Sequence, residues 1–290
     1  MTILITGATG TVGGHIVQHL LDLGAAVRCL TRNPANASFP DGVEVVQGDL
    51  RDPGTLGPAL DGVTAAHLIT FAGDDYAPIT EGEAIVARLQ EAGAARVTML
   101  TGDTEASPIE KAVAASSLEW TSLAPVEFMA NMLEWVDGFR AGRIEEGFVD
   151  VPSTVVHESD IARVAAHVLV DGGHHKETLW ITGPEALTVR ERVDVIQDVT
   201  GKAVDLIPLR TEDVQGQWRS YGFSEDDIDF MTQMKTNPPE AAKIPQETVR
   251  RVTGQDARTF RDWVIEHKTG GLPPVRGHGG VYAASASLAV

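Results

Sequence analysis

Cysteine is almost absent from this chain: Cys29 is the only one in 290 residues, so no disulfide can form within the chain. Long apolar runs are also missing, since runs such as Ala112–Ala115 are far shorter than the roughly 20 residues that cross a bilayer. The first residues lack the charged and apolar segments of a secretory signal and lead directly into a glycine-containing turn. Because disulfides are rare in reducing compartments, these absences predict a cytoplasmic protein that does not bind a membrane.

Basic residues are scarce, with 23 Lys and Arg against 41 Asp and Glu and a formal net charge of −18. Nucleic-acid binding depends on basic side chains that neutralise phosphates, so this charge argues against a nucleic-acid partner. Hydrophobic residues make up 43% and charged residues 22% of the chain, which is typical of a globular protein. The length fits one large domain or one domain with a smaller addition.

Short apolar segments alternate with helical patterns over the first two thirds of the chain, as in repeated β-α-β units. The predicted strands span residues 2–6, 26–31, 43–47, 65–70, 96–101, 120–123 and 179–182. The predicted helices span residues 14–23, 52–60, 81–92, 108–116, 159–169 and 188–200, with two or three more over 203–267. This order predicts an α/β fold: a Rossmann-type doubly wound parallel sheet with a smaller, mainly C-terminal α+β substrate region.

A glycine-containing turn follows the first predicted strand. The segment Ile3–Val17 runs through Gly7, Gly10 and Gly13 into a helix, with the spacing G-x-x-G-x-x-G. In a dinucleotide site, one glycine permits the tight turn, another lets the backbone approach the diphosphate, and a third allows close helix–strand packing. The first amides of the helix then face the anion. The position of the turn predicts a dinucleotide site; the alternative is a tight turn in another α/β protein.

The end of the second predicted strand indicates which dinucleotide binds. It reads Thr31-Arg32-Asn33-Pro34, without the acidic residue that usually binds the ribose 2′-hydroxyl of NAD. The planar guanidinium of Arg32 can bind a 2′-phosphate, which a carboxylate would repel. We therefore expect NADP(H) as the cofactor; the alternative is that Arg32 is a solvated surface residue.

Several motifs occur in order along residues 1–265. They are Thr6-Gly-Ala-Thr-Gly-Thr-Val-Gly13, Thr31-Arg-Asn-Pro34, Gln47-Gly-Asp-Leu50, Leu118-Glu-Trp-Thr121, Pro125-Val-Glu-Phe-Met-Ala-Asn131, His157-Glu-Ser-Asp-Ile-Ala162 and Thr182-Gly-Pro-Glu-Ala-Leu-Thr188. Together they resemble the NmrA-like, NAD(P)H quinone-oxidoreductase-like group of atypical short-chain dehydrogenases/reductases.

This resemblance implies an NADP-binding Rossmann domain over residues 1–155, on which residues 156–184 pack, and a substrate-covering region over 185–268. Glycine, proline and small residues predict a flexible tail over 269–290. The resemblance implies that the cofactor is bound by Gly7, Thr9, Gly10, Thr11 and Val12 at the diphosphate, by Arg32 at the 2′-phosphate, and by Asp49 and Leu50 at the adenine. It places Thr70, Phe71 and Thr101 along the ribose and nicotinamide, and Pro125 and Phe128 against the nicotinamide. It places the substrate pocket around Glu127, Met129, Asn131, Met132 and Trp135, although core packing explains the methionines and the tryptophan equally well.

The Tyr-x-x-x-Lys pair of typical short-chain dehydrogenases is absent. The residues four positions after Tyr76, Tyr221 and Tyr282 are Thr, Glu and Ala. The remaining catalytic candidates are Thr101, Ser107, Lys111 and His157. Three of them also have a non-catalytic interpretation: Ser107 only orients a substrate, Lys111 is a solvated helix residue, and His157 caps a helix or pairs with a neighbour. No metal site is expected, because His174 and His175 have no spaced further ligands.

Without a phenol acid, a conjugated acceptor that takes hydride directly fits better than a simple ketone, which needs an acid at its oxygen. The first hypothesis is therefore an NADPH-dependent oxidoreductase acting on a quinone-like or polycyclic aromatic small molecule. An NADP(H)-binding redox sensor and a redox-neutral cyclase or epimerase remain as alternatives. The sequence leaves open whether the protein is a monomer or a homodimer.

Overall fold

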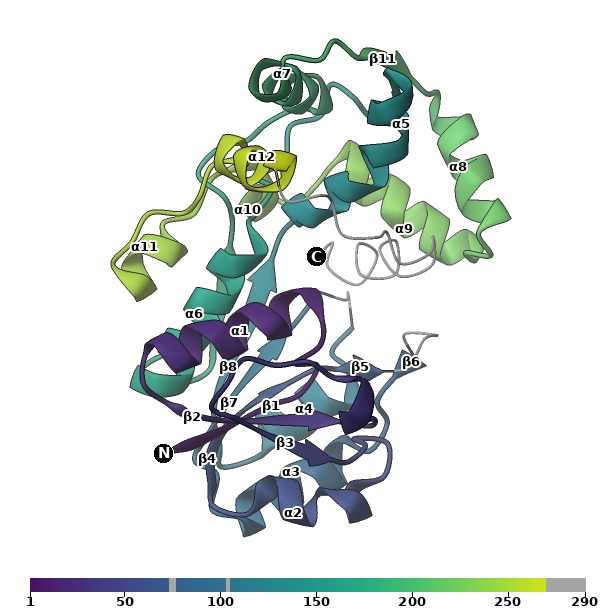
Figure 1. Ribbon diagram of the computed structural model, residues 1–290. Coiled ribbons are helices and arrows are strands. Elements are labelled where there is room, and N and C mark those ends of the chain that lie inside the picture. Colours follow the sequence, from purple (N-terminus) through teal and green to yellow (C-terminus); the bar gives the residue numbers. More distant parts are fainter. Residues whose placement is uncertain (73–76, 103–104, 270–290) are drawn as a thin grey trace. The chain divides into compact units, whose positions relative to one another are not determined.

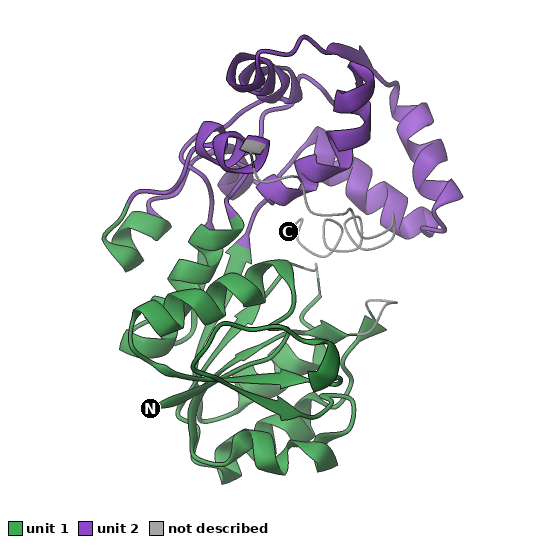
Figure 2. Ribbon diagram, viewed as in Figure 1, with its two compact units in different colours: residues 1–124, 158–179, 248–255 green, residues 125–157, 180–247, 256–290 purple. Residues whose placement is uncertain are grey.

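The computed structural model describes residues 1–72, 77–102 and 105–269, with side chains up to residue 268 (Figure 1). Tyr76, Tyr282 and the predicted tail beyond Thr269 lie outside the described residues. The chain forms two compact units (Figure 2). Unit 1 comprises residues 1–124, 158–179 and 248–255, and unit 2 comprises 125–157, 180–247 and the residues from 256 onward. These boundaries differ from those of the predicted domains, since residues 125–157 belong to unit 2 and residues 248–255 to unit 1.

A seven-stranded sheet forms the centre of unit 1, in the order β10-β8-β7-β4-β1-β2-β3. Its strands are β1 (Thr2–Ile5), β2 (Ala26–Thr31), β3 (Val43–Gln47), β4 (Val63–Leu68), β7 (Arg96–Leu100), β8 (Glu119–Pro125) and β10 (Glu177–Ile181). The pairings of β1 with β2 and β4, of β2 with β3, and of β7 with β4 and β8 are all parallel. The predicted Rossmann-type fold is confirmed. The chain order reverses between β1 and β4, and in such sheets ligands bind outside the carboxyl ends of the strands at this reversal.

Helices cover both faces of this sheet (Figure 1). Those of unit 1 are α1 (Thr11–Asp22), α2 (Gly57–Leu60), α3 (Gly82–Glu91), α4 (Pro108–Ala115), α6 (Glu158–Asp171) and α11 (Thr248–Thr253). Helix α1 packs against α6, whereas α3 packs against α4 on the other face. Successive side chains of a strand point to opposite faces, so Leu4, Leu68 and Met99 pack in one core cluster with Ile85 and Leu89 of α3.

The short strands β5 (Phe71–Ala72) and β6 (Ala77–Pro78) form an antiparallel pair that the sequence did not predict. Two residues per strand are too few for the alternation on which a strand prediction depends.

Unit 2 is mainly helical. Its elements are α5 (Val136–Ala141), β9 (Arg143–Glu146), α7 (Val189–Thr200), β11 (Asp205–Pro208), α8 (Thr211–Ser220), α9 (Glu225–Thr236), α10 (Glu240–Lys243) and α12 (Phe260–Thr269). Strands β9 and β11 pair in parallel. The expectation of two or three helices over 203–267 was too low, because α8, α9, α10, α11 and α12 all begin there. Phe260 and Trp263 of α12 pack with Ile144 and Val193 in the main core cluster of this unit.

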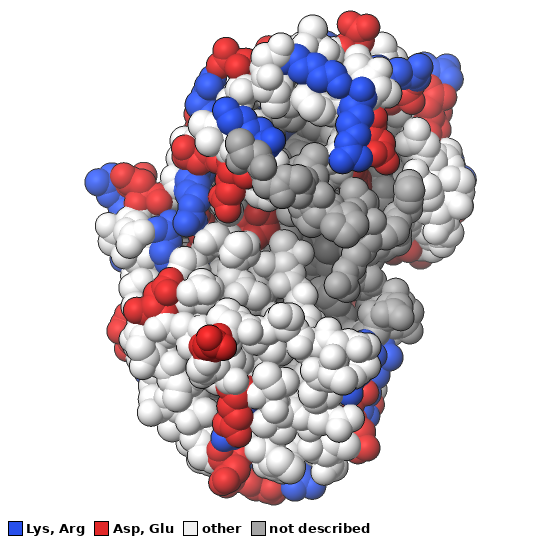
Figure 3. All heavy atoms as spheres, viewed as in Figure 1, with Lys and Arg blue, Asp and Glu red and all other residues white. Residues whose placement is uncertain are grey.

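Acidic and basic side chains are interspersed over the face of the molecule in Figure 3. None of the helices within the described residues has the length and apolar character that a membrane span requires.

His67 lies at the centre of the unit 1 sheet, in β4, and is 1% exposed. Its Nδ1 is 2.9 Å from the hydroxyl oxygen of Thr98 on β7. Burial lowers the pKa of His67 from 6.5 to about 4, because a charged imidazolium is poorly solvated there. The folded protein therefore keeps this ring neutral at pH values where an unfolded chain protonates it.

We expect the free energy of unfolding to fall as the pH decreases from about 6.5 to about 4, since only the unfolded state takes up the proton in this window. The contribution of His67 to this loss is about 3 kcal/mol. In His67→Gln, which has no titrating ring, urea unfolding over the same pH window should give a shallower slope. Val97→Ala, a buried neighbour without a titratable group, should lower stability by the same amount at each pH. An unchanged slope in His67→Gln would contradict this assignment.

Candidate functional site

The turn between β1 and α1 brings three backbone segments close together. Gly7 has a φ of +63°, a conformation that favours glycine. The carbonyl of Gly7 accepts a hydrogen bond from the amide of Gly10 (2.9 Å), and the carbonyl of Gly10 accepts one from Gly14 (3.0 Å). Gly10 is the N-cap of α1 and offers no side chain to the first amides of the helix. The first turn contains no acidic residue, so the start of α1 is suited to an external anion.

Gly13 shows how tightly this turn is packed. A Cβ on Gly13 would lie 2.2 Å from the carbonyl oxygen of Gly7, whereas a Cβ on Gly14 would approach no atom closer than 3.7 Å. Helix α1 can therefore begin against β1 only if residue 13 lacks a side chain. Of the other predicted diphosphate residues, Thr9 and Thr11 are exposed beside this turn, and Val12 is buried under it.

Thr6 fixes the turn to the neighbouring strand. Its buried hydroxyl donates to the carbonyl of His67 (2.9 Å) and accepts from the amide of Ile69 (2.8 Å). The carboxyl ends of β1 and β4 are thereby held together at the point where the chain order reverses. Thr70, predicted to bind the cofactor, follows this contact and is 6% exposed, and Phe71 is half-buried in β5.

Arg32 follows β2 and is exposed. Its carbonyl accepts from the side chain of Gln47, and its guanidinium has no partner among the residues that the structure describes. The predicted adenine neighbours have local roles: the carboxylate of Asp49 accepts from the amide of Arg51 (2.9 Å), and Leu50 lies in the core. Arg32 is thus available for a ligand, whereas Leu50 contributes mainly to packing.

The catalytic candidates of unit 1 have local structural roles or lie on the surface. Ser107 caps α4: its hydroxyl accepts from the amide of Glu110, whose carboxylate accepts from the amide of Ser107. Lys111 is exposed one turn further on. The hydroxyl of Thr101 donates to the carbonyl of Leu123 (3.3 Å). Ser107 and Lys111 are therefore a helix cap and a surface residue in this structure, and their predicted catalytic roles remain without support.

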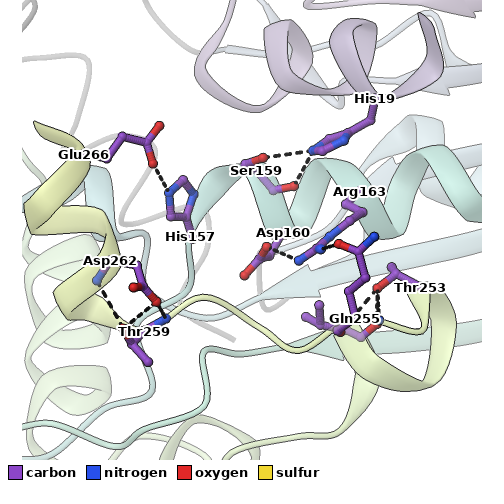
Figure 4. A network of polar contacts seen from close by, with 11 residues as sticks. His19, His157, Ser159, Asp160, Arg163, Thr253, Gln255, Thr259, Asp262 and Glu266 are labelled. Atoms are coloured by element: carbon purple, nitrogen blue, oxygen red, sulfur yellow. Dashed lines mark hydrogen bonds and ion pairs between the residues drawn. The ribbon is translucent and has the colours of Figure 1, made fainter. Parts of the chain in front are cut away.

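His157 lies in unit 2 and is 1% exposed. Its Nε2 is 3.1 Å from a carboxylate oxygen of Glu266 on α12 (Figure 4). This contact agrees with the alternative interpretation of His157, in which it pairs with a neighbouring residue. Figure 4 also shows the polar contacts of α6 within unit 1, where Ser159 contacts His19 and Arg163 contacts Asp160.

Unit 2 contains a cavity of about 160 Å³. Phe128 and the predicted pocket residues Glu127, Asn131, Met132 and Trp135 line it. Met129, the first residue of a 3₁₀ helix over Met129–Trp135, is not among the lining residues, because its side chain is fully buried in the core of the unit. Pro125 ends β8 and is buried.

Further aromatic and apolar side chains enclose this cavity. Phe148 stacks on Trp218, with ring centroids 6.3 Å apart and an interplanar angle of 19°. Phe148 adopts a φ of 51°, which is uncommon for a bulky residue and indicates a side chain held in place by its surroundings. Met231 and Met234 of α9 also line the cavity. These residues suit a flat apolar ligand.

An ion cluster centred on the carboxylate of Glu127 forms one wall of the cavity. One oxygen of Glu127 accepts from Ser153 (2.7 Å) and from Arg192 (3.1 Å), and the other accepts from Lys235 (2.9 Å). Burial by itself raises the pKa of Glu127, but the attraction of Arg192 and Lys235 and the Ser153 hydrogen bond outweigh it. They hold this pKa well below its usual range. Glu127 is therefore a permanent anion at neutral pH.

The sequence did not predict several of the residues that line the cavity. They are Glu146, Phe148, Ser153, Arg192, Trp218, Met231, Met234 and Lys235. Arg192 lies 65 and Lys235 lies 108 positions from Glu127 in the chain. Only the tertiary fold brings them together, so no local spacing could have indicated them. Within the described residues, no group of His, Cys, Asp and Glu is arranged to hold a metal ion.

The N-terminal part of the chain matches a protein-family model. Residues 1–100 match the model of the NmrA-like family. These residues include the turn after β1, Arg32 and the strands of the sheet up to β7.

Two curated proteins are similar over nearly the whole chain. One is the (4-alkanoyl-5-oxo-2,5-dihydrofuran-3-yl)methyl phosphate reductase of Streptomyces griseus, 33% identical over 293 residues, covering 91% of this chain and 97% of that protein. The other is the NAD(P)H azoreductase of Xenophilus azovorans, 29% identical over 284 residues, with 91% and 97% coverage.

Solved structures share the fold. An NADPH-dependent quinone oxidoreductase from Escherichia coli, solved with NADPH, superposes with a TM-score of 0.75 at 23% identity, covering 91% of this chain and 99% of that chain. The triphenylmethane reductase of Citrobacter sp., solved with NADP(H), gives a TM-score of 0.72 at 21% identity, with 92% and 99% coverage.

The two adjacent glycines of α1 provide a matched test of the turn. Gly13→Ala should destabilise the protein by roughly 1–3 kcal/mol, because the new methyl group overlaps the Gly7 carbonyl and α1 must move. Gly14→Ala should be neutral or stabilising by up to about 1 kcal/mol, since alanine favours a helix and its methyl group finds ordinary contacts. Urea unfolding of both variants measures the difference. Equal stabilities would show that the turn does not constrain residue 13.

Proposed function

We propose a function for this chain on one premise: the chain belongs to the NmrA-like family of atypical short-chain dehydrogenases/reductases. We infer that it is an NADPH-dependent oxidoreductase that delivers hydride to a conjugated small molecule, without a Tyr-Lys acid. The observation that carries this proposal is the turn after β1. There, Gly13 packs directly against the backbone of Gly7, and α1 begins without a side chain that caps its first amides.

The residues around this turn fit the cofactor NADP(H). Gly7, Thr9, Gly10, Thr11 and Val12 would surround the diphosphate, whose charge the first amides of α1 stabilise. Arg32, exposed after the neighbouring strand, would bind the 2′-phosphate through its guanidinium. When bound, NADPH supplies a hydride from its dihydronicotinamide ring. Thr70, Phe71, Thr101, Pro125 and Phe128 stay predicted neighbours of the ribose and nicotinamide.

The cavity of unit 2 supports a conjugated aromatic substrate. Its lining combines Phe128, Trp135, Phe148 and Trp218 with the ion cluster of Glu127, and no tyrosine is among the described residues that line it. A conjugated acceptor is electrophilic enough to take hydride without a phenol acid, so the task of these residues is to orient the substrate and to exclude water. The relatives named as azo, quinone and triphenylmethane reductases agree with an acceptor of this kind.

The proposal predicts that NADPH absorbance decreases with conjugated acceptors and not with a simple ketone. We expect oxidation with menadione, an azo dye or a triphenylmethane dye, and none above background with cyclohexanone, because a simple ketone needs an acid at its oxygen. Equal rates with cyclohexanone would contradict the phenol-free mechanism. Tight NADPH binding without oxidation by any acceptor would instead favour a redox sensor.

Arg32 should determine the preference for the phosphorylated cofactor. In Arg32→Gln the dissociation constant of NADPH should rise by roughly 10- to 100-fold, the value of a charged hydrogen-bond pair, whereas that of NADH should change little. Calorimetric titration with both nucleotides measures the effect. Arg88→Gln, on the exposed face of α3, serves as the control and should leave both constants unchanged. A similar loss for NADPH and NADH would mean that Arg32 does not read the 2′-phosphate.

A further inference from the structure

Lys235 is the most exposed member of the ion cluster in unit 2. It lies near the end of α9, and its ammonium is 2.9 Å from Glu127. Its side chain is 41% exposed, compared with 15% for Glu127 and 2% for Arg192. All three residues line the cavity. The cluster is thus graded, with a buried guanidinium, a carboxylate in the middle and an ammonium at its accessible end.

The inner members of the cluster do not depend on Lys235. Ser153 and Arg192 bind the oxygen of Glu127 that Lys235 does not use. Nη2 of Arg192 also donates to the hydroxyl of Ser153 and to the carbonyl of Leu187 (3.0 Å). Glu127 is therefore held in place independently of Lys235, and it positions the ammonium of Lys235.

The ammonium of Lys235 has N–H groups that can bind a ligand. A lysine ammonium has three N–H groups, and Glu127 is its one hydrogen-bond acceptor among the described residues. Burial lowers the pKa of Lys235, but Glu127 and then Glu146 outweigh it and raise this pKa above its usual value. Lys235 thus stays protonated, which suits it to stabilise an anion rather than to release a proton.

We propose that Lys235 stabilises the oxyanion that forms on a carbonyl oxygen of the substrate, and that the substrate is therefore a conjugated carbonyl compound such as a quinone or an unsaturated ketone or lactone. This inference rests on the proposed function. It narrows the acceptor class, because azo and triphenylmethane dyes accept hydride without forming an oxyanion at a conjugated carbonyl.

With an unsaturated carbonyl compound, the proposed step conserves atoms and electrons. A new C–H bond forms at the far carbon of the conjugated system from the hydride that NADPH supplies, so the substrate gains two electrons and NADPH loses them. The π pair of the C=C bond shifts toward the carbonyl oxygen, which becomes negatively charged. The ammonium of Lys235 stabilises this charge by a charge-assisted hydrogen bond. A proton from water then neutralises the product.

The test compares Lys235→Met, which removes the charge and keeps the length, with Lys235→Arg, which keeps the charge. Lys243→Met is the matched control, because Lys243 binds Asn237 and does not line the cavity. Glu127 retains Arg192 and Ser153 in every variant, so we expect all of them to fold.

The first readout is turnover with two acceptors. For Lys235→Met, kcat with menadione should fall by roughly 10- to 100-fold, the value of a hydrogen bond to a charged group. With a triphenylmethane dye it should stay within about 3-fold of the unmodified protein, a change below one charged hydrogen bond. Lys235→Arg should recover part of the menadione rate, and Lys243→Met should match the unmodified protein. Equal losses with both acceptors, or none with either, would overturn the proposal.

The second readout needs neither NADPH nor turnover. The probe is para-nitrophenolate, an aromatic oxyanion whose absorbance reports its binding. Lys235→Met should weaken its binding by roughly 10-fold or more, and Lys235→Arg should weaken it less. If no acceptor is reduced but this difference persists, the proposed function fails and the anion site of Lys235 stands. If the probe binds Lys235→Met as it binds the unmodified protein, the role of Lys235 fails whatever the turnover.

Discussion

The approach of α1 to the turn after β1 is the constraint on which the organisation of unit 1 depends. The carbonyl of Gly7 occupies the place that a side chain on residue 13 would need, and the hydroxyl of Thr6 joins the same turn to β4. Residue types here are restricted by backbone contact rather than by hydrophobicity. The packing that excludes side chains also leaves the first amides of α1 without a capping group, so one feature closes the fold and prepares an anion site.

Unit 2 uses a different principle. The walls of its cavity are mostly apolar and aromatic. One wall also contains the buried carboxylate of Glu127, which is bound by two cations and a hydroxyl. Removing a charge from water is costly unless its hydrogen bonds are satisfied, and Glu127 has such partners on both oxygens. The cluster orders residues from three distant parts of the chain and fixes the side chains around the space that they enclose.

The sequence predicted best what depends on neighbouring residues. Strands β2 and β3 have the predicted bounds 26–31 and 43–47, because their apolar runs end at turn residues. Strand β9 was missed because Arg143–Glu146 is mostly charged and is extended only through its pairing with β11. Glu127 was predicted as a pocket residue, but its partners Arg192 and Lys235 were not, because their proximity is a property of the tertiary fold. The helix-capping role of Ser107 was not predicted, although Ser107 and Glu110 have the spacing of a capping box.

Lys235 differs in its electrostatic surroundings from the lysine of the Tyr-x-x-x-Lys pair in typical short-chain dehydrogenases. There, a lysine lowers the pKa of a tyrosine so that the phenol can exchange a proton with the substrate. Here, Glu127 raises the pKa of Lys235, so the ammonium holds its proton more strongly. Such a group cannot act as an efficient acid near neutral pH, but it can stabilise a negative charge as that charge forms. An acceptor that delocalises electrons onto an oxygen needs only the stabilisation of that charge, which connects the absence of a Tyr-x-x-x-Lys pair to the substrate class that we infer.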